Sequence, residues 1–230
     1  MSAVLAIETS VPQASVVLWI DAEIVFVDEF TTDRSHNSMI FEPLSQALKL
    51  LGERKLSLII AGTGPGSYSG TRVGIAAAQG IAIAHGCPAV GIGSLAATPE
   101  ARAAFSTTDP TTCVAMAIGD ARRGLYYISE INSHGEAENA ELMAAKPFLE
   151  RLAAAPDTRL FTLDDPAQLG LSEDLKNRVT RSRPEAKWLM EIWLGLSESR
   201  RSAIKQKPLA PAYLRPPFTS KAKAGHPLLR

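Results

Sequence analysis

The chain has 230 residues, of which 46% are hydrophobic and 21% charged, and its 24 basic and 24 acidic side chains give a formal net charge of zero. A chain of this length and composition buries enough surface to fold without disulfides or a structural metal. These values exclude a disordered chain, a collagen and a small disulfide-rich scaffold.

The charge is unevenly distributed along the chain. Residues 199–230 contain eight basic side chains and no acidic one, so the rest of the chain carries a balance of −8. One interpretation is a solvated basic tail. The other is a weak electrostatic contact with RNA or an acidic partner.

Apolar and cysteine patterns argue against export, membrane insertion and metal binding. The N-terminal apolar run stops at Glu8 with no basic region before it, which favours a cytoplasmic protein over a secreted one. Residues 73–99 lack charge, but their small side chains and the break at 85–88 predict a buried helix, a turn and a strand, with no membrane span. Two cysteines and four histidines without ligand spacing predict neither a disulfide nor a metal site.

The sequence of the first half of the chain predicts a mixed α/β unit. Apolar runs of strand length predict five strands, at 3–7, 14–20, 24–30, 56–61 and 89–92. One-sided apolar spacing predicts two helices, over 35–51 and from about 69 to 84. The first two strands are expected to form a hairpin.

After a polar connection at 98–110, the pattern partly restarts. We expect strands at 113–118, 125–131 and 159–163, a short helix at 147–154 and an amphipathic helix over 184–201. Glu8 and Asp120 each follow the first strand of a half. The sequence therefore predicts a duplicated α/β fold with a first lobe at 1–100, a degenerate second lobe at 101–207 and a Pro-rich, basic, partly disordered segment at 208–230.

The strongest local motif is the glycine-rich block at 62–72, which follows a strand and opens a helix. Backbone N–H groups at such a helix start attract anions. The block lacks the lysine of a P-loop and the third glycine of a dinucleotide fingerprint. A structural turn and an anion site stay open as alternatives. For the anion site, the candidates are Glu8, Thr9, Ser10, Gly64, Gly66, Ser67 and Asp120, with a Mg²⁺–nucleotide held through water.

The two predicted helices of the first half have more apolar surface than one core contact needs. The second of them is apolar nearly all round, which indicates burial on two sides. The extra face predicts either a two-sided core position or an interface with another subunit. The candidate interface residues are Met39, Ile40, Phe41, Leu44, Leu48, Val73, Ala76, Ala77, Gly80, Ile81 and Ala84.

Five segments in a fixed order carry a resemblance to a known family. They are AIETS at 6–10, GPGSYSGTRVG at 64–74, GIGSL at 91–95, DARRG at 120–124 and PAYLR at 211–215. Together they resemble the bacterial TsaB (YeaZ) family, with glycoprotease-like relatives, over residues 3 to about 215 and weakly from 131 to 207.

The resemblance implies an actin/Hsp70-like (ribonuclease-H-like) fold and a place in the complex that makes threonylcarbamoyladenosine next to the anticodon of tRNA. In that system TsaD transfers the threonylcarbamoyl group, TsaB pairs with TsaD, and an ATPase, TsaE, joins them. TsaD-type proteins carry a His-x-x-x-His metal pair where this chain has Ser94 and Thr98. Hydroxyls are poor ligands for a transition metal, so we expect no metal site here.

We therefore expect a non-catalytic scaffold subunit with no catalytic residue and no cofactor of its own, although a weakly bound Mg²⁺–nucleotide at the partner interface stays open. Expected partners are a TsaD-like protein, a TsaE-like ATPase and, when the chain is alone, a second copy of it. We expect tRNA contact only through the complex and no membrane contact. The alternatives are an ATP-binding phosphotransferase or ATPase acting by itself and an RNA-binding module that uses the basic tail.

Overall fold

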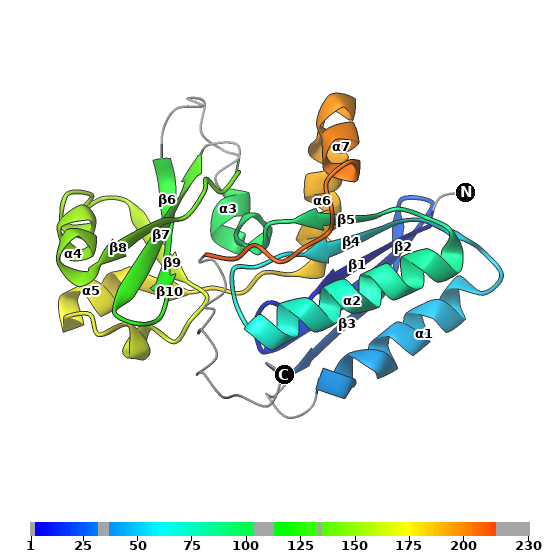
Figure 1. Cartoon of the computed structure of the whole chain (residues 1–230), viewed down its shortest axis with the longest axis horizontal. Helices are drawn as coiled ribbons and strands as arrows, with labels where there is room; N and C mark the ends of the chain where they lie inside the picture. Colours follow the sequence, from blue (N-terminus) through cyan, green and yellow to red (C-terminus); the bar gives the residue numbers. More distant parts are fainter. Residues whose placement is uncertain (1–2, 32–36, 104–112, 133–134, 215–230) are drawn as a thin grey trace, which may run out of the picture.

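The computed structural model describes residues 3–31, 37–103, 113–132 and 135–214. The chain forms two five-stranded sheets that lie in separate lobes (Figure 1). The first sheet has the strand order β3–β2–β1–β4–β5, with β2 antiparallel to both its neighbours and β1, β4 and β5 parallel. Its strands are β1 (Ala3–Glu8), β2 (Gln13–Ile20), β3 (Glu23–Thr31), β4 (Leu56–Gly62) and β5 (Ala89–Ile92).

The second sheet repeats this topology. Its order is β10–β9–β6–β7–β8, in which β7 is antiparallel to both its neighbours and β6, β9 and β10 are parallel. Its strands are β6 (Cys113–Asp120), β7 (Leu125–Asn132), β8 (Glu141–Ala144), β9 (Arg159–Thr162) and β10 (Val179–Arg181). The predicted duplicated, two-lobed α/β fold is confirmed, and Glu8 and Asp120 end equivalent strands.

The second lobe is the smaller version of the same plan. Its β8 has four residues where β3 has nine. The first lobe connects its last two strands through the 18-residue α2 (Tyr68–His85). The second lobe uses a 3₁₀ turn at Pro166–Leu169 and the six-residue α5 (Glu173–Arg178) for that connection. The helix α4 (Ala145–Ala153) stands where the first lobe has α1 (Phe41–Leu51).

Helices cover both faces of the first sheet (Figure 1). On one face α1 and α2 pack over residues such as Leu5 and Leu18, and on the other α6 (Ala186–Gly195) packs over Ala6 and Val17. Because β1 is buried on both faces, its residues 3–7 are all apolar. The helix α6, which lies within the range expected for the second lobe, thus packs on the first sheet. The domain boundaries themselves stay a prediction.

Two of the predicted helices differ from the structure by more than two residues at an end. The helix expected over 184–201 is two helices, because Gly195 ends α6 and the Ser197 hydroxyl caps α7 (Glu198–Lys205) by accepting the Arg200 N–H. The helix expected from 35 is a 3₁₀ turn at Asn37–Ile40 followed by α1, and residue 35 lies outside the described residues. Short helical segments also occur at Ser94–Ala97 and in α3 (Pro99–Ala103).

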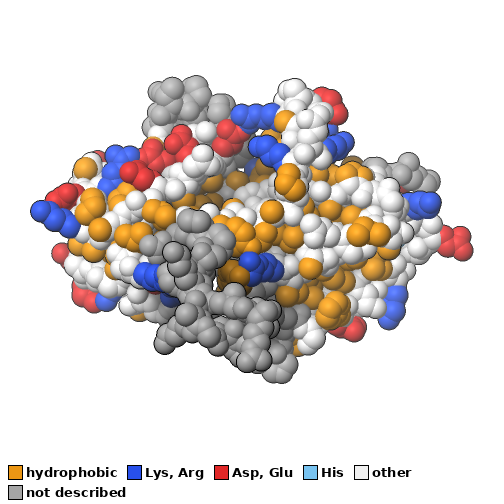
Figure 2. Space-filling model, in the orientation of Figure 1, with side chains coloured by type: hydrophobic (Ala, Val, Ile, Leu, Met, Phe, Trp, Pro, Cys, Tyr) orange, Lys and Arg blue, Asp and Glu red, His pale blue; other side chains and the backbone are white. Residues whose placement is uncertain are grey.

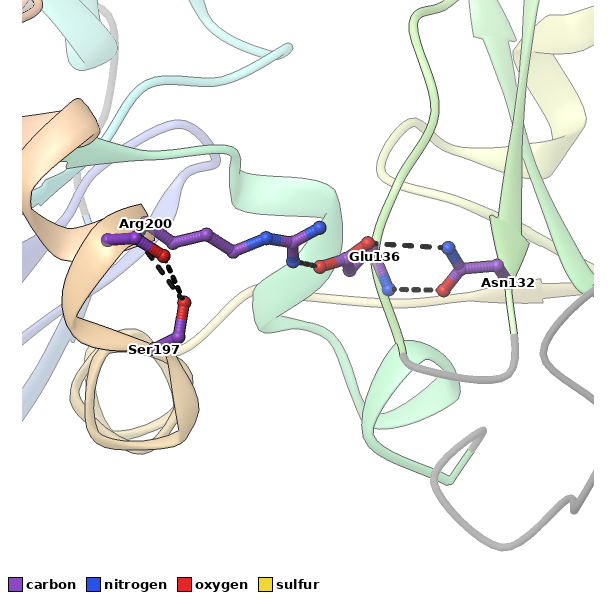
Figure 3. A network of polar contacts seen from close by, with 5 residues as sticks. Asn132, Glu136, Ser197 and Arg200 are labelled. Carbon is purple, nitrogen blue, oxygen red and sulfur yellow. Dashed lines mark hydrogen bonds and ion pairs between the residues drawn. The ribbon is translucent and has the colours of Figure 1, made fainter.

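Among the contacts that tie the lobes together, two involve the C-terminal part of the chain. On α7, Arg200 pairs with Glu136 of the second lobe, and the Glu136 N–H donates to Asn132 Oδ1 at 3.0 Å (Figure 3). The second tie is residues 206–214, here called the C-terminal strap. Leu209 of the strap packs against the core beneath α2, and Leu214 packs against the core of the second sheet.

Within the described ranges, no helix is long and apolar enough to cross a bilayer. The uncharged stretch at 73–99 forms most of α2 and all of β5, as its small residues and its break predicted.

The packing of α6 on the first sheet predicts a contrast between two leucines of that helix. Leu189 is fully buried, so Leu189→Ala should lower the free energy of unfolding by about 2–5 kcal/mol. Leu194 is 54% exposed, and Leu194→Ala should change it by no more than about 0.5 kcal/mol. Urea unfolding of both variants measures this, and equal effects would contradict the packing described.

Candidate functional site

The end of β1 carries a carboxyl group sealed inside the first lobe. Glu8 is fully buried, and its Oε1 accepts the Ser10 N–H at 2.7 Å, whereas its Oε2 has no hydrogen-bond partner among the described residues. Gly62 makes room for it, because a Cβ there would overlap Oε2. Burial raises the pKa of Glu8, and the nearby polar groups of Ser10, Ser94 and Thr9 only partly oppose that.

The glycine-rich block brings the start of α2 against the end of β1. The Ser67 N–H donates to Ser10 O at 2.6 Å, and Thr9 Oγ1 donates to Gly70 O at 2.8 Å. Gly66 has a φ of 156°, and a Cβ there would overlap Ser10 O. The block therefore serves close approach of helix and strand, which is the structural alternative left open by the sequence.

Protein groups already use several donors of the predicted anion site. The Gly64 N–H donates to Ser94 Oγ at 2.9 Å, and the Gly70 N–H donates to Ser67 Oγ at 3.2 Å. Ser94 and Thr98 are both fully buried, and Thr98 Oγ1 donates to Leu95 O at 2.8 Å. The two hydroxyls that stand at the expected histidine positions therefore hold loops together. Anion binding at this loop stays a prediction.

A cleft of about 840 Å³ lies between the lobes. Five of the candidate anion-site residues line it, namely Ser10, Gly64, Gly66, Ser67 and Asp120. Glu8 and Thr9 do not line it. The Ser10 hydroxyl is buried and has no hydrogen-bond partner among the described residues. The structure thus brings the loop and Asp120 to one cleft but keeps the Glu8 carboxyl out of it.

Asp164 is a cleft residue that the sequence analysis missed. It follows β9, and its Oδ2 accepts the Asp120 N–H at 3.2 Å. Burial raises the pKa of Asp164 and the nearby Asp120 carboxylate adds to this, while the Asp120 N–H and the cations Arg122 and Arg181 lower it. The available signal was an acid directly after a strand parallel to β6, since carboxyl ends of parallel strands meet at one edge. In the described ranges, no three His, Cys, Asp or Glu side chains are grouped as a metal site.

A second missed feature lies at the mouth of the cleft. The Arg72 guanidinium carbon lies 3.5 Å from the ring centroid of Tyr68, and Arg72 donates from Nε and Nη2 to Tyr213 Oη at 3.0 and 2.6 Å. Tyr68 and Tyr213 line the cleft. The strap is held beside them, because Ala212 N–H donates to Thr63 O at 2.8 Å and Gln79 to Leu209 O at 3.1 Å.

An apolar groove of about 870 Å³ runs between α1 and α2. Figure 2 shows hydrophobic side chains gathered over this face. Eight of the eleven candidate interface residues line the groove: Phe41, Leu44, Leu48, Val73, Ala76, Ala77, Gly80 and Ile81. Of the other three, Met39 and Ala84 are exposed and Ile40 is buried in the core beneath. The interface role of these residues stays a prediction.

Comparison with known proteins places this architecture in a family. The model of a family described as TsaD, tRNA N6-adenosine threonylcarbamoyltransferase, matches residues 30–155, which is more than half of the chain. The tRNA threonylcarbamoyladenosine biosynthesis protein TsaB of Haemophilus influenzae is 26% identical over 234 residues, covering 96% of this chain and 97% of the relative. The chain belongs to the TsaB (YeaZ) family.

Other relatives agree with that family. The TsaB protein of Escherichia coli is 31% identical over 147 residues, covering 60% of this chain and 62% of the relative. The solved structure of YeaZ from Pseudomonas aeruginosa has a TM-score of 0.65 at 23% identity, covering 93% of this chain and 100% of that one. At that identity the likeness shows the fold, which is the two-lobed fold described above.

The sealed carboxyl of Glu8 predicts a pH dependence of stability. A folded chain with a raised pKa keeps a proton that the unfolded chain releases near the ordinary value of 4.5. Stability should therefore fall as pH rises above that value, by at most about 1.4 kcal/mol per pH unit, until the folded pKa is passed. Glu8→Gln cannot ionise, so its free energy of unfolding should rise relative to the natural chain over this range. Urea unfolding at a series of pH values measures the difference, and a constant difference would contradict the burial of an ionisable group.

Proposed function

We propose that the chain is a non-catalytic partner subunit in threonylcarbamoyladenosine modification of tRNA, and that it binds a TsaD-like transferase through the α1–α2 groove. Membership of the TsaB family supports the pathway, because both curated relatives are called tRNA threonylcarbamoyladenosine biosynthesis proteins. The observation that carries the docking role is the groove itself.

The groove has the chemistry of a helix-docking surface. Its α2 wall consists of the small or branched apolar residues Val73, Ala76, Ala77, Gly80 and Ile81, which let another helix approach closely. Lys49 is the one charged residue that lines it within the described chain. A site with so few polar groups cannot orient a small polar substrate, but it suits the apolar face of a partner helix.

The rest of the site supports a partner subunit over a free-standing ATPase. A nucleotide between the lobes needs free donors at the α2 loop and a reachable acid at the end of β1. The Gly64 and Ser67 N–H groups donate to Ser94 and Ser10, and Glu8 is sealed behind the cleft. These contacts favour a fixed scaffold, so the ATP-binding alternative has less support.

The proposal also assigns the other partners. A TsaE-like ATPase joins the pair, and tRNA is reached through the complex. When no TsaD-like protein is present, the same apolar face pairs with a second copy of this chain, because an exposed groove of this size is costly to leave in water.

A charge placed in the groove tests this. Ala77→Glu should abolish co-elution with the TsaD-like protein of the same organism and reduce threonylcarbamoyl transfer to tRNA to the level of that protein alone, because the new carboxylate would be buried unpaired at the contact. Co-elution by size-exclusion chromatography and incorporation of labelled threonine into tRNA measure the two effects.

A matched control is available on α7. Ala203 is exposed and remote from the groove, so Ala203→Glu introduces the same charge and should leave co-elution and transfer unchanged. Circular dichroism should show both variants folded. Full co-elution of Ala77→Glu would contradict docking at the groove, and transfer without this chain would contradict the partner role.

A further inference from the structure

Two segments that carry the family resemblance meet at a place that the docking role does not use. Tyr68 and Arg72 come from the glycine-rich block, and Tyr213 comes from the strap 141 residues later. We call these three residues the aromatic platform. Tyr68 and Tyr213 line the interlobe cleft, and Arg72 contacts both of them, while the groove residues of α2 begin at Val73.

The platform exposes flat surfaces that a buried core contact would hide. Tyr68 is 66% exposed and Tyr213 is 49% exposed, and their ring centroids are 6.4 Å apart with the planes 42° apart. Arg72 stacks on the Tyr68 ring and bonds to the Tyr213 hydroxyl, which fixes all three planes. Fixed, exposed tyrosine and arginine planes are the surfaces on which unpaired nucleobases stack.

The charge of Arg72 is available to an anion. Its partners are two tyrosines, and no carboxylate pairs with it in the part of the chain that the structure describes. The tyrosine hydroxyl bonds raise the pKa of the guanidinium further, so its full positive charge stays beside the rings. A cation next to stacking planes can bind the phosphate that adjoins a stacked base.

We propose that Tyr68, Arg72 and Tyr213 form a binding site for an unpaired nucleotide of RNA, with the base stacked on the tyrosine rings and an adjoining phosphate on Arg72. The inference rests on the proposed function, since tRNA is the RNA which that function supplies. The inference goes beyond the proposed function because it places this chain itself in contact with the RNA.

A protein contact is the competing class, because tyrosine and arginine also dominate protein interfaces. Two observations favour RNA. Tyr68 and Tyr213 line a concave cleft that also carries charged side chains, and neither of them lines the apolar α1–α2 groove. The α2 side of that cleft adds the partial positive charge of a helix start, and the opposite wall carries Arg122 and Arg181 together with Asp120, Asp164 and Asp165. The phosphate is therefore expected on the α2 side, next to Arg72.

The test is a binding titration with a short labelled single-stranded RNA and with unmodified tRNA, using the chain alone and in complex with its TsaD-like partner. Tyr68→Ala should weaken affinity about tenfold at fixed salt, because one stacking surface is lost, and should leave the salt dependence unchanged. Arg72→Gln should reduce the slope of log affinity against log salt by about 0.7, the value for one phosphate contact on a single strand. Leu194→Ala removes another large exposed apolar side chain, on α6, and is the control, with unchanged affinity expected.

Each other outcome overturns the inference. An RNA affinity of Tyr68→Ala equal to that of the unsubstituted chain would exclude the platform as an RNA site. So would the absence of measurable RNA affinity for the unsubstituted chain, both alone and in complex. Lost co-elution with the TsaD-like protein in Tyr68→Ala, with RNA affinity kept, would identify a protein contact instead. The groove variant Ala77→Glu tests the docking proposal separately, because RNA binding by the chain alone does not depend on the groove.

Discussion

The position of α2 depends on its close contact with the end of β1. The Ser67 N–H bonded to Ser10 O and the Thr9 hydroxyl bonded to Gly70 O fix the helix start to the strand end. This contact is possible only because a glycine at 66 leaves space for the Ser10 carbonyl. Since α2 forms one wall of the groove and one wall of the cleft, a single contact sets the geometry of both surfaces.

The two halves of the duplicated fold use their equivalent acids in opposite ways. Asp120 stays at the cleft surface, where it accepts the backbone and side-chain N–H groups of Arg122. Glu8 is sealed beneath the loop with one oxygen unpartnered, and burial raises its pKa. An uncharged Glu8 packs at less cost than a charged one, which suits a structural role better than the binding of a cation.

Local sequence patterns predicted the structural features that depend on residues close together in the chain. Strand alternation and helix spacing predicted the strands and main helices of the first lobe and β6, β7 and β9 of the second, but they missed the short elements β8, β10 and α5. The spacing of residues such as Leu44, Leu48 and Ala77 predicted most of the groove. Apolar periodicity shows that a face is buried but not what buries it, so it could not assign α6 to the first sheet. The cap at Ser197 divided one predicted helix into two, because a local hydrogen bond outweighed the continuing period.

The parts that the sequence did not predict are contacts between distant segments. Arg72 meets Tyr213 only because the strap returns along α2, and Asp164 meets Asp120 only because β9 pairs with β6. Neither pairing produces a periodic pattern of residues in the sequence of a single chain. Chemistry at such places must therefore be read from the folded chain.

The arrangement along α2 links the two proposed surfaces. An α-helix rises 1.5 Å per residue, so Tyr68 lies about 14 Å from Ala77 along the helix axis. A partner docked in the groove would thus lie within a few nucleotides' length of the aromatic platform. The strap is held along α2 by the Arg72–Tyr213 and Gln79–Leu209 hydrogen bonds, so the platform and the groove are parts of one helix and its attached strap. A rigid subunit of this kind can act on a reaction that it does not catalyse, by holding a partner and an RNA strand at a fixed separation on one helix.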